Sequence, residues 1–258
     1  AKYLPQIGWQ SIILTTPIGE RPDSRFGPPD DFKTKMNVIE TFGYGPTDIR
    51  AYAKEHFDSK KSYRKVKPFL RFLYRRYSEI IHYPDVEKGW APFAVKACYE
   101  LLQKEKVNAI ISSSPPVTAH LIAKELRNKY KIPWVADLRD LWSQNANYPY
   151  GRVRRFFDQR LELKTLELAD ALVAVSSPMT EKLRMLHRGK TVYTILSGFD
   201  PDKMSSGKAS LTSKFTITYT GQTYAKQDPS KLLATLRSLI HERSIDPKNV
   251  DVRFYGPE

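Results

Sequence analysis

The sequence predicts an α/β fold in which a parallel sheet carries helices on both faces. Along most of the 258 residues, short apolar runs alternate with amphipathic stretches of helical spacing. Polar side chains also follow four successive apolar runs, at residues 112–114, 137–140, 176–177 and 197–198. Because ligands of such sheets bind outside the carboxyl ends of the strands, these four segments predict a candidate site.

The individual elements follow in chain order. Residues 11–16, SIILTT, are β-branched and apolar and predict a strand, and residues 37–42 alternate as a second strand would. The glycines and prolines of 17–35 predict a loop between them. Further strands are expected at 107–114, 132–137, 171–177 and 191–199, and helices at 90–105, 115–130, 155–170 and 178–187.

Residues 47–83 predict a helical segment of strongly basic character. Its apolar side chains, among them Phe69, Leu73 and Tyr77, fall at helical spacing. The cations around them are Arg64, Lys65, Lys67, Arg71, Arg75 and Arg76. Such a helix suits an anionic membrane surface, and it also suits a core-facing helix whose basic face lies in solvent.

Beyond residue 200 the same alternation begins again. Residues 201–214 are small and polar and predict a linker. A strand at 215–221, a helix at 229–244 and a strand at 250–256 follow it. These elements predict the first unit of a second Rossmann-like domain. We expect both ends of the chain to be cut, because it opens on what reads as the last turns of a helix.

Composition narrows the class of protein. The 42 Lys and Arg exceed the 28 Asp and Glu, and the net charge of +14 favours a polyanionic partner, or else only a basic surface kept for solubility. No nucleic-acid-binding motif accompanies this charge, so we expect an anionic membrane or a phosphorylated ligand. The single cysteine, Cys98, excludes an intrachain disulfide and a cysteine-rich zinc site, and the five histidines lack ligand spacing. We expect a cytoplasmic protein with no metal and no cofactor.

Four stretches match a known family in their order and spacing. They are SSSPPVTAHLIAKEL (112–126), KIPWVADLRDLW (131–142), TLELADALVAVSSPMTEKLRML (165–186) and YTILSGFDPDKM (193–204). They resemble the N-terminal domain of glycosyltransferases of the GT-B fold, in the large retaining family four. The resemblance covers nearly the whole chain and is strongest over 85–200. The stretch from 215 looks like the first strand, turn and helix of the family's nucleotide-binding domain.

The resemblance implies a division into domains. Residues 1–200 would form an acceptor-binding, Rossmann-like domain that lacks its first strand. Residues 201–214 would be the linker, and 215–258 the truncated beginning of a nucleotide-sugar-binding domain. We expect this piece alone to be inactive, because most of the donor site would lie outside it.

The resemblance and the polar strand ends together give candidate site residues. Those expected to line the acceptor cleft are Ser113, Ser114, His120, Asp137, Arg139 and Asp140, and those expected on the donor side are Ser197, Gly198, Gly221 and Lys226. Gln222 stands where many members carry arginine, which leaves Lys226 as the nearby cation for the diphosphate. No catalytic base is assigned, because the departing phosphate can accept the proton in the reaction proposed for the family.

Several of these residues could instead have a purely structural role. Asp140 would cap the next helix if the charged cluster is only an ion pair, and His120 would be a capping or core residue. Trp90 and Trp142 could stack on sugar rings, although a packed core position is the commoner fate of tryptophan.

The implied activity is transfer of a hexose, with retention, from a nucleotide-sugar to a glycan or lipid-linked acceptor. The setting would be synthesis of a cell-surface polysaccharide or glycolipid, with the protein held peripherally at the inner face of the cell membrane. The alternatives are a nucleotide-sugar 2-epimerase of the same fold and a non-catalytic carbohydrate- or membrane-binding module.

Overall fold

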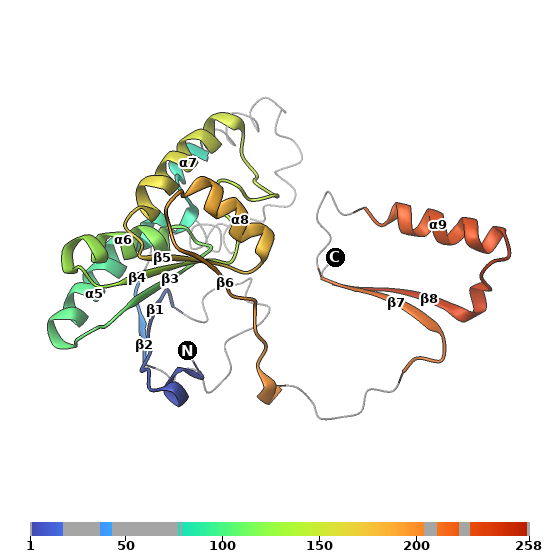
Figure 1. The fold of residues 1–258 in the computed structure, drawn as a ribbon, viewed down its shortest axis with the longest axis horizontal. Helices are drawn as coiled ribbons and strands as arrows, with labels where there is room; N and C mark the ends of the chain where they lie inside the picture. The colour runs from blue at the N-terminus through green and yellow to red at the C-terminus, as the bar shows by residue number, and fades with distance from the viewer. Residues whose placement is uncertain are drawn as a thin grey trace, which may run out of the picture. The chain divides into compact units, whose positions relative to one another are not determined.

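The chain divides into two compact units, residues 1–198 and 199–258 (Figure 1). The computed structural model describes residues 2–17, 37–42, 77, 79–203, 211–221 and 228–256. Parts of the predicted 47–83 helix, including all six of its named cations, therefore lie outside the described residues, as does Lys226. Among the described residues, no helix is both long and apolar enough to cross a membrane.

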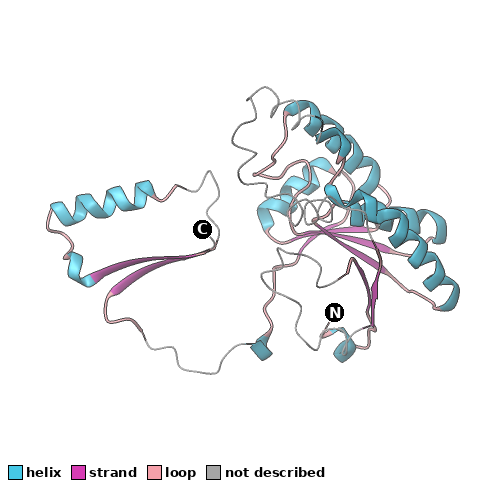
Figure 2. Cartoon of the chain, turned by 180° about the vertical axis from the view of Figure 1, so that it is seen from behind, coloured by secondary structure: helices cyan, strands magenta, loops and turns pink. Residues whose placement is uncertain are grey.

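A four-stranded parallel sheet in the order β3-β4-β5-β6 forms the centre of the first unit. Its strands are β3 (Ile110–Ser114), β4 (Trp134–Leu138), β5 (Ala171–Ala174) and β6 (Val192–Thr194). The connections run through α6 (Thr118–Tyr130), α7 (Arg152–Leu166) and α8 (Ser177–Leu186). Figure 2 shows the same sheet and helices from behind. The alternation of strands and helices, and hence the predicted α/β fold with parallel strands, is confirmed.

The main core lies between this sheet and its helices. Alternate residues of a strand point to the same face, and Trp134, Ala136 and Leu138 of β4 are fully buried on that face. Leu166 at the end of α7 and Leu183 of α8 complete this core cluster. The side chains that alternate with them, among them Ser113 and Asp137, point to the opposite face.

A second cluster fixes the segment that precedes β3. The strands β1 (Ile12–Thr15) and β2 (Asn37–Glu40) form a separate parallel pair after the short 3₁₀ helix η1 (Leu4–Ile7). The 3₁₀ helix η3 (Val86–Trp90) leads into α5 (Ala91–Lys104), which packs on α6. Leu14 of β1 packs against the buried residues of this cluster, which are Trp90, Ala94, Cys98, Ile122 and Leu126.

The second unit contains one strand–helix–strand repeat. The strands β7 (Phe215–Thr220) and β8 (Val250–Tyr255) pair in parallel over six residues and are joined through α9 (Ser230–His241). Two short 3₁₀ helices are η4 (Pro201–Lys203), within the predicted linker, and η5 (Pro247–Asn249), before β8. The predicted elements of this part of the chain are therefore present.

The element boundaries shift by a few residues from those expected. The helix predicted from residue 115 begins at Thr118, after the two prolines. The strand predicted to reach residue 177 ends at Ala174, and Ser176 becomes the N-cap residue of α8. The indole rings of Trp90 and Trp142 are buried, as the structural alternative proposed.

Candidate active site

Two predicted site residues meet at the carboxyl edge of the sheet. Ser113 of β3 and Asp137 of β4 are register partners, and the Ser113 hydroxyl donates a hydrogen bond of 2.9 Å to Asp137 Oδ2. Both side chains lie on the face opposite the main core, where Ser113 is exposed and Asp137 half-buried. A carboxylate held in this way keeps oxygen atoms that can accept hydrogen bonds from sugar hydroxyls.

Arg139 and Asp140 follow directly after β4. The Arg139 amide donates to the carbonyl oxygen of Ser114 at 3.2 Å, which ties this turn to the end of β3. Both side chains are exposed, and no hydrogen bond or ion pair joins either to another residue in the part of the chain that the structure describes. The Asp140 carboxylate and the Arg139 guanidinium are therefore open to a ligand, the second to a carboxylate or phosphate.

His120 lies beneath this edge, in the first turn of α6, and is fully buried. Its Nδ1 is 2.7 Å from the hydroxyl of Ser112, which also accepts a hydrogen bond of 2.7 Å from the indole Nε1 of Trp134. Since an indole N–H only donates, Ser112 accepts from Trp134 and can give its own hydrogen to His120 Nδ1. The proton of the neutral imidazole then sits on Nε2.

Burial lowers the pKa of His120 to about 3, so the ring is neutral at neutral pH. Its Nε2 and the Ser114 hydroxyl oxygen are both buried without a hydrogen-bond partner among the described residues. A buried donor without a partner is costly unless something supplies an acceptor. This histidine can therefore act as a hydrogen-bond donor, and its pKa makes it a poor proton carrier at neutral pH.

The turn between β3 and α6 is held by Asp85, to which sequence reasoning gave no role. Its carboxylate accepts from the Thr118 amide at 2.8 Å, from the Thr118 hydroxyl at 2.6 Å, and from the Glu87 amide at 3.0 Å. A carboxylate at the start of a helix satisfies free amides and complements the helix dipole. Asp85 thus fixes the first turn of α6, which carries His120.

The segment after Asp140 is anchored by buried acidic residues of α7. The Glu162 carboxylate accepts from the Ser143 amide at 3.0 Å and lies 3.3 Å from His187 Nε2, at the C-terminal end of α8. One helical turn earlier, the Asp158 carboxylate accepts from the Tyr148 hydroxyl. These contacts hold two points of the 141–151 segment, which begins directly after the candidate site.

Arg154 joins the same segment to the chain before η3. Its guanidinium pairs with Asp158 at 3.1 Å and donates to the carbonyl oxygen of Pro84 at 2.7 Å. It also lies over the rings of Tyr83 and Tyr150, with its central carbon 4.6 and 4.5 Å from the ring centres. Desolvation raises the pKa of Asp158, and the Tyr148 and Arg154 contacts lower it in part. The network is buried and polar, which predicts an ordered segment.

The predicted donor-side residues fall in both units. Ser197 and Gly198 lie three and four residues beyond β6 and are exposed. Gly221 ends β7 in the second unit with φ of +135°, a backbone angle that favours glycine, and its amide donates to the carbonyl oxygen of Tyr255 at 2.8 Å. Their relation across the two units stays a prediction.

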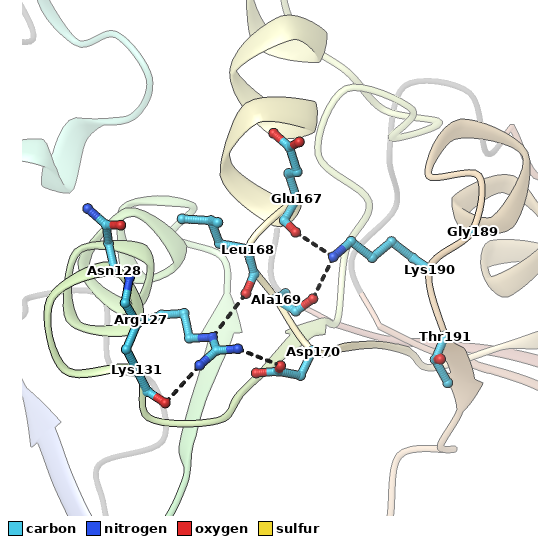
Figure 3. A pocket seen from close by; sticks show the side chains of 10 residues that line it. All are labelled: Arg127, Asn128, Lys131, Glu167, Leu168, Ala169, Asp170, Gly189, Lys190 and Thr191. Carbon is cyan, nitrogen blue, oxygen red and sulfur yellow. Dashed lines mark hydrogen bonds and ion pairs between the residues drawn. The ribbon is translucent and has the colours of Figure 1, made fainter.

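A cavity of about 410 Å³ lies at the opposite, amino edge of the sheet (Figure 3). Two of its three cations, Arg127 and Lys190, already have partners. Arg127 bonds to Asp170 and to the carbonyl oxygens of Lys131 and Leu168, and Lys190 bonds to the carbonyl oxygens of Glu167 and Ala169. Basic side chains that bind carbonyl oxygens beyond a helix C-terminus stabilise that end. We therefore assign this cavity no part in the candidate site, none of whose residues lines it.

A parallel sheet whose strands are connected by helices, with polar side chains along its carboxyl edge, defines a Rossmann-like domain. The family model described as Glycosyltransferase Family 4 matches residues 1–203, and the chain belongs to this family. The resemblance to GT-B glycosyltransferases drawn from the sequence is thereby confirmed. No curated protein matches the chain.

Proposed function

We propose that the protein transfers a hexose, with retention, from a nucleotide-sugar to a glycan or lipid-linked acceptor. The observation that carries this proposal is the open polar edge formed by the Ser113–Asp137 hydrogen bond and the exposed Arg139 and Asp140 side chains. Family membership supports a glycosyl transfer, and the open edge supports an acceptor held at the carboxyl ends of β3 and β4.

The chemistry assigns a separate task to each group. The Asp137 carboxylate orients an acceptor hydroxyl, and the buried His120 supports the end of β3 through its contact with Ser112. The new bond from the acceptor oxygen to the anomeric carbon forms as the bond from that carbon to the phosphate oxygen breaks. The acceptor proton passes to the departing phosphate, so no protein base is required. Arg139 offers two parallel donors to an anionic group of either substrate.

Further parts of the proposal come from the sequence. Residues 201–214 would link the acceptor domain to a donor domain that starts at 215, where Gly221 and Lys226 would lie close to the diphosphate. The donor groups would also include Ser197 and Gly198. We propose no metal and no cofactor, and an acceptor that belongs to a cell-surface polysaccharide or glycolipid. The net charge of +14 supports a peripheral place at the inner face of the cell membrane.

The test is a panel of nucleotide-sugars incubated with the intact protein, with and without acceptors, followed by product analysis. Release of nucleoside diphosphate that depends on an acceptor supports transfer. Conversion of the donor sugar without any acceptor would instead show the epimerase, and no change in any donor would contradict both enzymes.

A matched pair of variants then tests whether the carboxyl edge that carries Asp137 takes part in sugar transfer. Asp137→Asn removes the carboxylate charge at the candidate site, and Glu105→Gln makes the same change at an exposed position after α5. We expect the first to lower kcat/KM for the acceptor by about 10-fold or more, as loss of a charge-assisted hydrogen bond implies. Equal activity of both folded variants would remove Asp137 from the site.

A further inference from the structure

The helix α7 has its polar and apolar faces reversed. Its buried side chains include Arg154, Asp158, Glu162 and Thr165, all of them polar or charged. Its exposed apolar side chains are Val153, Phe156, Phe157 and Leu163, which are 73, 50, 54 and 38% exposed. A helix that packs on a core normally buries its apolar stripe, so this arrangement leaves an apolar stripe without a partner in the described residues.

Within α7 the same exposed stripe carries positive charge only, and the exposed Glu167 follows at the C-cap position. At helical spacing, Val153, Phe156, Phe157 and Leu163 share one continuous arc with Arg152, Arg160 and Lys164, and we call this arc the outer face of α7. Both acidic residues of the helix, Asp158 and Glu162, are buried on the other side. The Arg160 guanidinium lies over the Phe156 ring at 4.5 Å, which shows how closely cation and aromatic ring are interleaved.

A cavity of about 580 Å³ continues this surface toward the end of α8. It shares Arg160, Leu163 and Lys164 with the outer face of α7, and Leu186 and Arg188 line it from the other side. Glu167, His187 and Lys190 complete the lining, which therefore carries four Lys or Arg side chains against one acid. Two leucine side chains and this excess of cations suit a phosphate headgroup and the first carbons of a lipid.

We infer that the outer face of α7 docks on an anionic phospholipid bilayer, with lipid headgroups at the adjoining cavity. The interleaved phenylalanines and cations of α7 match the pattern of a helix that lies in the membrane interface. At 15 residues the helix offers about 22 Å of contact. A second copy of this chain is a poor occupant, because each copy has a net charge of +14 and would bring a second positively charged face against this one.

This location suits a lipid-linked acceptor. A helix that follows a parallel strand runs back along the sheet, so Arg152 lies near the carboxyl edge that carries Asp137. Docking of α7 would hold that edge close to the bilayer. This consequence rests on the proposed function, whereas lipid binding does not and can be measured without any sugar transfer.

The test is co-sedimentation of the full chain with vesicles of phosphatidylcholine alone or mixed with phosphatidylglycerol. We expect binding only to the anionic vesicles, and weaker binding as salt increases. The double variant Arg160→Gln and Lys164→Gln should bind about 30-fold more weakly, since each cation near an anionic surface contributes about five- to sixfold. Phe156→Ala should weaken binding by at least about 10-fold through lost apolar contact.

The matched control is the double variant Lys104→Gln and Lys106→Gln, which removes two exposed cations at the end of α5. It should bind nearly as the unchanged chain does. Equal loss in the two double variants would show attraction by net charge alone and overturn the proposal. Binding that ignores anionic lipid, or self-association in solution that Phe156→Ala abolishes, would overturn it as well. Loss of vesicle binding with transfer to a soluble acceptor retained would separate this surface from the active site.

Discussion

Replacement of His120 by glutamine should remove a large part of the acid sensitivity of the fold. Burial lowers the pKa of His120 from its usual 6.5 to about 3 in the native protein. Between these two values the unfolded chain binds a proton at this ring and the native protein does not. Stability conferred by the neutral ring is therefore complete above about pH 6.5 and falls as the pH drops toward 3.

The magnitude follows from the two pKa values. One pKa unit corresponds to about 1.4 kcal/mol, so the native protein should lose about 2.5 kcal/mol through His120 between pH 7 and pH 4.5. The glutamine side chain of His120→Gln does not bind a proton in this pH range. The variant is expected to be less stable than the natural protein at pH 7, and this difference should shrink by about 2.5 kcal/mol at pH 4.5.

Urea unfolding followed by tryptophan fluorescence at several pH values measures this difference, since Trp134 lies beside the ring. Ser112→Ala is the informative companion, because it removes the hydrogen bond to Nδ1 and leaves the ring buried. Since desolvation is the cause of the shift, Ser112→Ala should retain most of the pH dependence. A constant stability difference between His120→Gln and the natural protein from pH 7 to pH 4.5 would refute the reasoning.

Two further substitutions and one labelling reaction test buried contacts described above. Asp85→Ala should cost about 1–2 kcal/mol of unfolding free energy, because the Thr118 amide and hydroxyl lose their acceptor, and an unchanged urea midpoint would contradict this. Arg154→Met should cost about 3–5 kcal/mol by leaving Asp158 buried without its cation, and a loss below about 1 kcal/mol would show that the pair is dispensable. Burial raises the pKa of the Cys98 thiol to about 11, so at pH 8 a disulfide reagent should label it only after unfolding, and rapid labelling of the folded protein would argue against its burial.

The sequence was sufficient for the order of the elements and for the meeting of Ser113 and Asp137 at the carboxyl edge of the sheet. Apolar runs and helical stretches alternate at short spacing, and this pattern has few solutions other than parallel strands. The Ser113–Asp137 pair follows from it, because neighbouring parallel strands bring their carboxyl ends together. Boundaries were less predictable, since the serines after Ala174 fit a strand end and a helix start equally well.

Contacts between distant segments could not be read from local patterns. Asp85 reaches Thr118 across 33 residues, and nothing near Asp85 in the sequence indicates its partner. His120 was predicted to face the cleft from its place in the first turn of α6. Its complete burial depends on Trp134, which lies on the next strand and hydrogen bonds to the same serine. A strand end predicts where a site lies, but the depth of each side chain depends on its neighbours.

The reversed faces of α7 are the strongest case of tertiary structure overriding sequence pattern. Hydropathy alone would bury Phe156 and Phe157 and expose Asp158 and Glu162. The buried carboxylates instead accept hydrogen bonds from the segment that follows Asp140, at Ser143 and Tyr148. A buried ionic network rarely stabilises a fold more than apolar side chains would, so its presence here is better explained by the segment that it positions. The phenylalanines of the helix then face solvent or a partner. A positively charged surface with exposed aromatic rings favours an anionic lipid bilayer. One choice of helix orientation thus connects an ordered segment at the candidate site with the proposed membrane contact.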